Sequence, residues 1–106
     1  MKIQVIHKAF EESPVQVAEV NAPDDLTITS ALEYAYRWTN NFEGSWSLDD
    51  LENNKDANPN VTRVAPLIEY KGKTFGLRST SMMDLMIVDG KTYEVMGCGF
   101  EEIASC

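Results

Sequence analysis

The sequence predicts an α+β domain, in which one main helix packs on one face of a twisted antiparallel sheet of about five or six strands. Short apolar runs alternate with polar residues, as strands do, and only one segment has helical periodicity. Turn residues separate several of the runs by lengths typical of hairpins. Because the 106 residues are 43% hydrophobic, we expect a single compact domain over residues 1–106.

The N-terminal segment predicts a hairpin. Residues 2–10 alternate between apolar and polar side chains, and residues 15–20 do so until Val20 breaks the strict period of two. The polar residues 11–14, which end in Pro14, separate the two runs by a length common in hairpin loops.

Residues 30–39 contain the helical pattern. Ser30 and Glu33 have the spacing of a capping box, in which the serine hydroxyl accepts from the amide three residues on. The β-branched residues 27–29 argue against an earlier start, although Asp24 or Asp25 could cap one. Apolar residues follow on two adjacent stripes, one with Leu32, Ala35 and Tyr36 and one with Tyr34 and Trp38. Residues 40–44, which include Gly44, end the helix.

An irregular acidic loop is expected after the helix, with residues 49–60 as its mobile part. Acidic or amide side chains at positions 50, 52, 54 and 56 have the alternate spacing of a calcium loop. Lys55 stands where such a loop needs glycine, and Val61 where it needs glutamate. A solvated acidic loop without metal is therefore the favoured interpretation.

The remaining sequence predicts strands and hairpins. Residues 61–70 and 74–78 flank a tip at Gly72, and residues 85–89 and 92–96 flank Asp89–Gly90, a strong turn signal. Residues 97–103 extend the second hairpin, and the glycines at 97 and 99 suggest a bulge there. Lys71, Lys73 and Arg78 form a small basic island on or beside the first hairpin.

Two C-terminal motifs point to a family. Residues 78–84 read Arg-Ser-Thr-Ser-Met-Met-Asp, and residues 99–103 read Gly-Phe-Glu-Glu-Ile. This pattern resembles small proteins of bacteriophages and other mobile elements, including YodL-like domains, in which glycine usually stands at the position of Met83. The resemblance implies a phage or prophage origin and a host-cytoplasm setting. It also implies an accessory role such as blocking a host protein, including a defence factor in the manner of anti-CRISPR proteins.

Catalytic chemistry is disfavoured. His7 is the single histidine, and no Gly-x-Ser-x-Gly elbow surrounds any serine. Cys98, flanked by glycines, fits a small buried residue in a strand better than a reactive thiol. We expect no enzyme activity and no cofactor, and an enzyme that uses His7 or Cys98 is the minority hypothesis.

The charge of -8 bears on partners and location. Residues 1–30 have two bases and five acids, residues 31–60 two and six, and residues 61–106 five and six, so the acidity lies in the first sixty residues. Direct nucleic-acid binding is disfavoured because neutralising phosphates needs excess Lys and Arg. Without a long apolar run or a signal sequence, we expect a cytoplasmic protein that does not enter membranes.

Exposed aromatic residues beside the acidic loop are the expected partner-binding surface, because Trp and Tyr are enriched at interface hot spots. The predicted contact residues are Trp38, Phe42, Trp46, Asp49, Asp50, Glu52 and Asp56. The favoured hypothesis is a non-enzymatic protein that binds and inhibits a host protein. Two alternatives are an acidic DNA mimic that blocks a nucleic-acid-binding cleft and a small structural or assembly protein of a phage.

Overall fold

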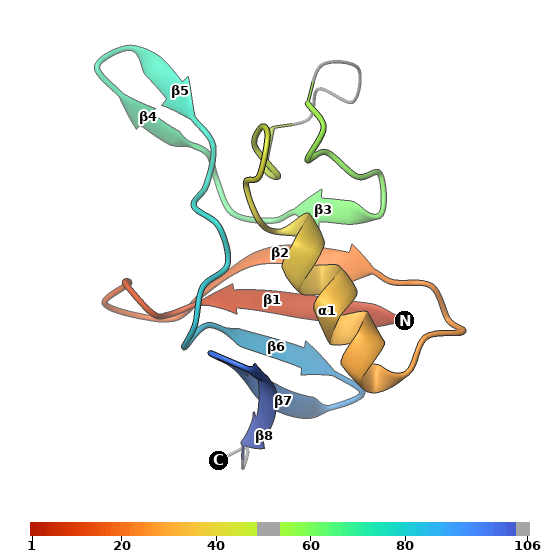
Figure 1. Cartoon of the computed structure of the whole chain (residues 1–106). Helices are drawn as coiled ribbons and strands as arrows, with labels where there is room; N and C mark the ends of the chain where they lie inside the picture. Colours follow the sequence, from red (N-terminus) through yellow and green to blue (C-terminus); the bar gives the residue numbers. More distant parts are fainter. Residues whose placement is uncertain (49–53, 104–106) are drawn as a thin grey trace.

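The α+β class is confirmed by the structure, a computed structural model that describes residues 1–48 and 54–103. Six strands form an antiparallel sheet in the order β3-β2-β1-β6-β7-β8, and β4 and β5 form a separate two-stranded sheet. Helix α1 lies across one face of the larger sheet (Figure 1). The elements are β1 (Lys2–His7), β2 (Val15–Asn21), α1 (Ile28–Trp38), β3 (Val61–Arg63), β4 (Ile68–Tyr70), β5 (Lys73–Phe75), β6 (Leu85–Val88), β7 (Lys91–Met96) and β8 (Gly99–Ile103).

The predicted N-terminal hairpin is formed by β1 and β2, with an irregular register. Val5 pairs with Ala18, but Ile6 pairs with Gln16, so Val17 is the extra residue of a bulge. Both Val17 and Ala18 are buried. The bulge shifts the alternation by one residue, which explains why Val20 breaks the period of two and is still buried.

Helix α1 begins earlier than the sequence predicted. The Thr27 hydroxyl, and not that of Ser30, accepts from the backbone, with Ser30 N–H donating over 3.1 Å. β-branched residues cost a helix only a few tenths of a kcal/mol each, so this cap and the burial of Leu32 outweigh their propensity. The helix ends at Trp38, and the Thr39 hydroxyl donates to the carbonyl of Ala35 over 2.7 Å.

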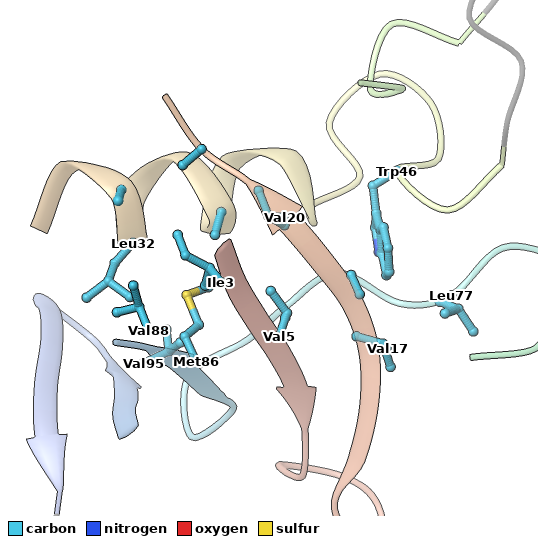
Figure 2. Packing of buried hydrophobic residues seen from close by; sticks show 14 of the residues in the cluster. Ile3, Val5, Val17, Val20, Leu32, Trp46, Leu77, Met86, Val88 and Val95 are labelled. Atoms are coloured by element: carbon cyan, nitrogen blue, oxygen red, sulfur yellow. The ribbon is translucent and has the colours of Figure 1, made fainter. Parts of the chain in front are cut away.

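The core lies between α1 and the larger sheet. Leu32 of the helix packs near Ile3, Met86 and Val88 of the strands, as Figure 2 shows. The same cluster reaches beyond β2, where Trp46 is buried at the far end from Leu32 (Figure 2). The core therefore has two parts, one covered by α1 and an extension covered by the loop after α1.

Two short turns confirm the predicted hairpin tips. Lys71–Gly72 and Asp89–Gly90 all have positive φ, between 51° and 77°, as a two-residue type I′ turn requires. The first hairpin is shorter than predicted, because residues 61–63 pair with β2 as β3. The β4–β5 hairpin consequently projects away from the larger sheet (Figure 1).

Cys98 lies in the tight turn between β7 and β8, where Met96 pairs with Gly99. The thiol is exposed, so the expectation of a buried strand cysteine is wrong. The two glycines had suggested a bulge. The structure has a turn there, in which Gly99 adopts a positive φ of 104°. No helix in the described part of the chain is both long and apolar enough to cross a bilayer.

Met83 adopts a left-handed backbone conformation, with φ of 79°. A non-glycine residue in this region destabilises the folded chain by about 1 to 2 kcal/mol. Glycine avoids this strain, but its greater freedom in the unfolded chain offsets part of the gain. We expect Met83→Gly to raise the free energy of unfolding by about 0.5 to 1 kcal/mol. Met82→Gly is the matched control and should lower stability, because Met82 does not have a positive φ. Urea denaturation of both variants tests this, and a destabilised Met83→Gly would contradict it.

Candidate partner-binding surface

Trp46 does not lie on the surface where the sequence placed it. Its side chain is only 3% exposed, and its indole N–H donates to the carbonyl of Arg78 over 2.8 Å. The ring meets His7 edge-on, with centroids 6.3 Å apart. The expectation that Trp46 contacts a partner is corrected, because the extension of the core beyond β2 takes up the whole indole.

Asp56 is likewise buried, with 0% exposure, and binds internally. One carboxylate oxygen accepts from the amides of Phe42, Glu43 and Gly44 over 2.7–2.9 Å, and the other accepts from Arg37 over 3.2 Å. Burial raises the pKa of Asp56, but these amides and Arg37 outweigh it and hold the pKa below its ordinary value. Asp56 therefore organises the loop after the helix, and its predicted role as a contact residue is corrected.

The other predicted residues divide between accessible and undescribed positions. Phe42 is 64% exposed, and Trp38 is half-buried. The guanidinium carbon of Arg37 lies 4.2 Å from the Trp38 ring centroid and 4.8 Å from that of Phe42, so the cation holds both rings. Asp49, Asp50 and Glu52 lie outside the described residues. Within the expected mobile segment, residues 54–60 hydrogen-bond to the body through Asn54, Asp56 and Asn58.

Arg78 and Asp84, the ends of the first family motif, form an internal ion pair. Asp84 is fully buried and accepts two bonds from Arg78, over 2.7 and 2.8 Å. It also accepts from the amides of Lys8, Ala9 and Ser81 over 2.8–3.0 Å. Burial raises the pKa of Asp84, but Arg78 and these amides outweigh it and lower the pKa to about 2. The motif thus fastens the start of β6 to the end of β1.

Arg78 does not belong to the predicted basic island, because its guanidinium is bound inside the fold. All five N–H groups of its guanidinium are used, by Asp84, by both carboxylate oxygens of Glu11 and by the Ser79 carbonyl. The bonds to Asp84 and to Glu11 raise the pKa of Arg78 above its ordinary value. Only Lys71 and Lys73, at the tip of the β4–β5 hairpin, remain as exposed cations of that group.

His7 is 2% exposed and belongs to a chain of hydrogen bonds. Thr80 donates its hydroxyl proton to Thr39 over 2.8 Å, and Thr39 donates to the Ala35 carbonyl. The Thr80 oxygen therefore accepts from Nε2–H of His7, over 3.0 Å, which fixes the neutral tautomer. Burial, and then the charge of Arg78, lower the pKa of His7 to about 4. The imidazole links β1 to the end of the helix.

An apolar groove lies between the β4–β5 hairpin and the strands β1 and β2. Its volume is about 320 Å³. Apolar side chains form most of its walls, and the ion-paired Glu11 and Arg78 border it together with the buried ring of His7. The apolar lining consists of Val15, Val17, Ala65, Pro66, Ile68 and Leu77.

The hairpin adds an exposed apolar face to this groove. Ile68 pairs with Phe75, and Tyr70, two residues from Ile68, points to the same side. All three side chains are exposed, Tyr70 by 62%, and Phe10 stands nearby with its ring over Arg78. We define the hairpin surface as Ile68, Tyr70, Phe75 and the groove. The alternation of Ile68 and Tyr70 in a predicted hairpin was the signal for it, but the sequence did not show that the larger sheet would leave this hairpin uncovered.

Within the described ranges, no group of three or more His, Cys, Asp or Glu side chains could hold a metal ion. Comparison of the chain with protein-family models, with curated proteins and with solved structures gives no match.

Proposed function

We propose that this chain is a non-enzymatic accessory protein of a bacteriophage or related mobile element, which binds a host protein and blocks its activity. The hairpin surface is the contact site. The single observation behind this proposal is that Ile68, Tyr70 and Phe75 share one exposed face of a projecting hairpin, beside an apolar groove.

The energetics of the hairpin support a binding role. A two-stranded hairpin is marginally stable in water unless its apolar face is covered. Here the face is uncovered and contains two aromatic rings and an isoleucine, the kinds of side chain that contribute most when a partner removes them from water. The type I′ turn holds the hairpin in shape before binding, which lowers the entropy that a partner must overcome.

The environment of the only histidine supports a function without catalysis. Nε2 of His7 is bound to Thr80, and the ring is packed against Trp46. Cys98, the other residue considered for catalysis, lies apart from it in the β7–β8 turn. Both residues have a place in the fold that requires no substrate.

The DNA-mimic alternative is less well supported by the arrangement of carboxylates. Asp56 and Asp84 are buried, and Glu11 is held by Arg78. These three of the seventeen acidic side chains do not present free charge to a partner in place of phosphates. The side chains at the hairpin tip, Lys71 and Lys73, have the opposite sign.

Paired serine substitutions at the hairpin test the proposal. We expect Tyr70→Ser with Phe75→Ser to weaken binding of a captured and then purified host protein at least about tenfold, because hot-spot aromatics contribute about 2 kcal/mol or more. Calorimetry measures the affinity, and the host protein's activity is followed as the chain is added to one equivalent. Phe42→Ser is the control, since Phe42 is as exposed as Tyr70, at 64% against 62%, but lies in the loop after the helix. Loss of binding with Phe42→Ser alone would move the site to that loop and contradict the proposal.

A further inference from the structure

The β4–β5 hairpin has backbone groups that point outward. Its two-residue turn makes Tyr70 and Lys73 a hydrogen-bonded pair, and pairs alternate along an antiparallel ladder. Glu69 and Thr74 are therefore the non-bonded pair, and their N–H and C=O groups face away from the hairpin. In the described part of the chain these groups have no backbone partner.

The two edges of the hairpin differ in what lies beside them. After β5 the chain packs closely against the loop that follows α1, so that a Cβ on Gly76 would clash with the Ser45 hydroxyl. The amide of Leu77 donates to the Ser47 hydroxyl in the same place. The β4 edge has Glu69 at its centre, and Ile68 beside it lines the apolar groove. A strand added at the β4 edge would therefore lie beside the apolar groove.

A second copy of this chain is a poor occupant. Two β4 strands paired antiparallel about a two-fold axis would place Glu69 opposite Glu69, since it is the central residue of a three-residue strand. Like charges directly opposite each other destabilise a strand pair, and edge charges commonly prevent such self-pairing. The same carboxylate favours a cation on the strand of a different protein.

We propose that the host partner adds an extended segment antiparallel to β4, with an apolar–basic–apolar triplet centred on Glu69. This deepens the proposed function and rests on it. The basic side chain lies opposite Glu69, and its backbone N–H and C=O bond to those of Glu69. The two apolar side chains alternate to the other face, where they lie beside Ile68 and Tyr70 and cover the groove.

A short peptide tests the edge directly. The probe is acetyl-Thr-Val-Lys-Val-Thr-amide at millimolar concentration, added to ¹⁵N-labelled full-length chain. We expect the amide signal of Glu69 to shift, and those of β8, the outermost strand of the larger sheet, to stay. Methylation of the lysine backbone nitrogen should weaken binding at least about tenfold, because it removes the central hydrogen bond and leaves the charge. Shifts confined to β8, or equal binding of the methylated peptide, would overturn the inference.

A charge exchange separates this inference from the proposed function. Glu69→Lys should bind the lysine peptide at least about tenfold more weakly and regain affinity for the same peptide with glutamate in place of lysine. If the captured host protein loses affinity for Tyr70→Ser with Phe75→Ser but binds Glu69→Lys as before, the hairpin remains the contact site and strand addition to β4 is wrong. If it binds both variants as before, the proposed function fails as well.

Discussion

Replacement of Asp84 with alanine is expected to lower the free energy of unfolding by about 3 to 5 kcal/mol, a large fraction of the 5 to 15 kcal/mol of a typical domain. The substitution leaves three amides, at Lys8, Ala9 and Ser81, without their acceptor. Of the two carboxylates that bind Arg78 in the described part of the chain, it leaves Glu11. Removing one member of such a pair costs more than the pair itself contributes, because the partly buried donors left behind lose their acceptor.

Urea denaturation followed by tryptophan fluorescence measures this loss, since Trp46 is buried in the folded chain. Glu43→Ala is the control, because Glu43 pairs with Lys55 at 3.6 Å and both side chains are exposed. A surface pair of this kind contributes less than about 1 kcal/mol. If the two variants are destabilised equally, the motif does not have the structural role assigned to it.

Acidification is expected to remove about 3 kcal/mol of stability between pH 6.5 and pH 4, through His7. In the folded chain the pKa of His7 is about 4, against an ordinary value of 6.5. The unfolded chain therefore binds the extra proton throughout this range, and stability falls as pH falls, by about 1.4 kcal/mol for each pH unit. The contribution is complete above pH 6.5. Asp84, with a pKa of about 2 against 3.8, adds a further loss only below pH 3.8.

His7→Gln provides the test, because glutamine can still donate to Thr80 but does not titrate. Urea midpoints at pH 7, 5.5 and 4.5 should decline steeply for the natural chain and much less for the variant. The groups that face His7 are Arg78, Asp84 and Glu11. The two carboxylates have lowered pKa values, from 4.5 for Glu11 and from 3.8 for Asp84, so their own loss of stability begins near and below pH 4.5, and the decline from pH 7 to 5.5 reports His7. Equal slopes for the two proteins would show that another group causes the decline.

Much of the fold could be predicted because local signals and packing agree. Asp89–Gly90 and Lys71–Gly72 specify their turns through backbone conformation alone. The first prediction to fail was the helix start, where Ser30 has the better capping pattern but Thr27 forms the cap. The predicted extent of the first hairpin was also wrong. Residues 61–63 pair with β2, and strand pairing between segments that far apart in the chain has no local signal.

The candidate site was harder to predict than the fold. Trp46 and Asp56 have the composition of a binding surface, but each finds an internal partner far along the chain, the Arg78 carbonyl and the amides at 42–44. Exposure is decided by such long-range contacts, so residue type alone misled the prediction. The exposed residues Ile68, Tyr70 and Phe75 looked in the sequence like ordinary strand residues that a sheet would cover.

The central position of β1 has a consequence for synthesis of the chain. β1 pairs with β2 on one side and with β6, from Leu85 onward, on the other. While a ribosome is still making the middle of the protein, the second side of β1 has its hydrogen-bonding groups open, next to Ile3 and Val5. An open apolar strand of this kind recruits other chains. Truncated products that end before residue 85 should therefore collect in inclusion bodies, whereas the full-length product closes its own sheet.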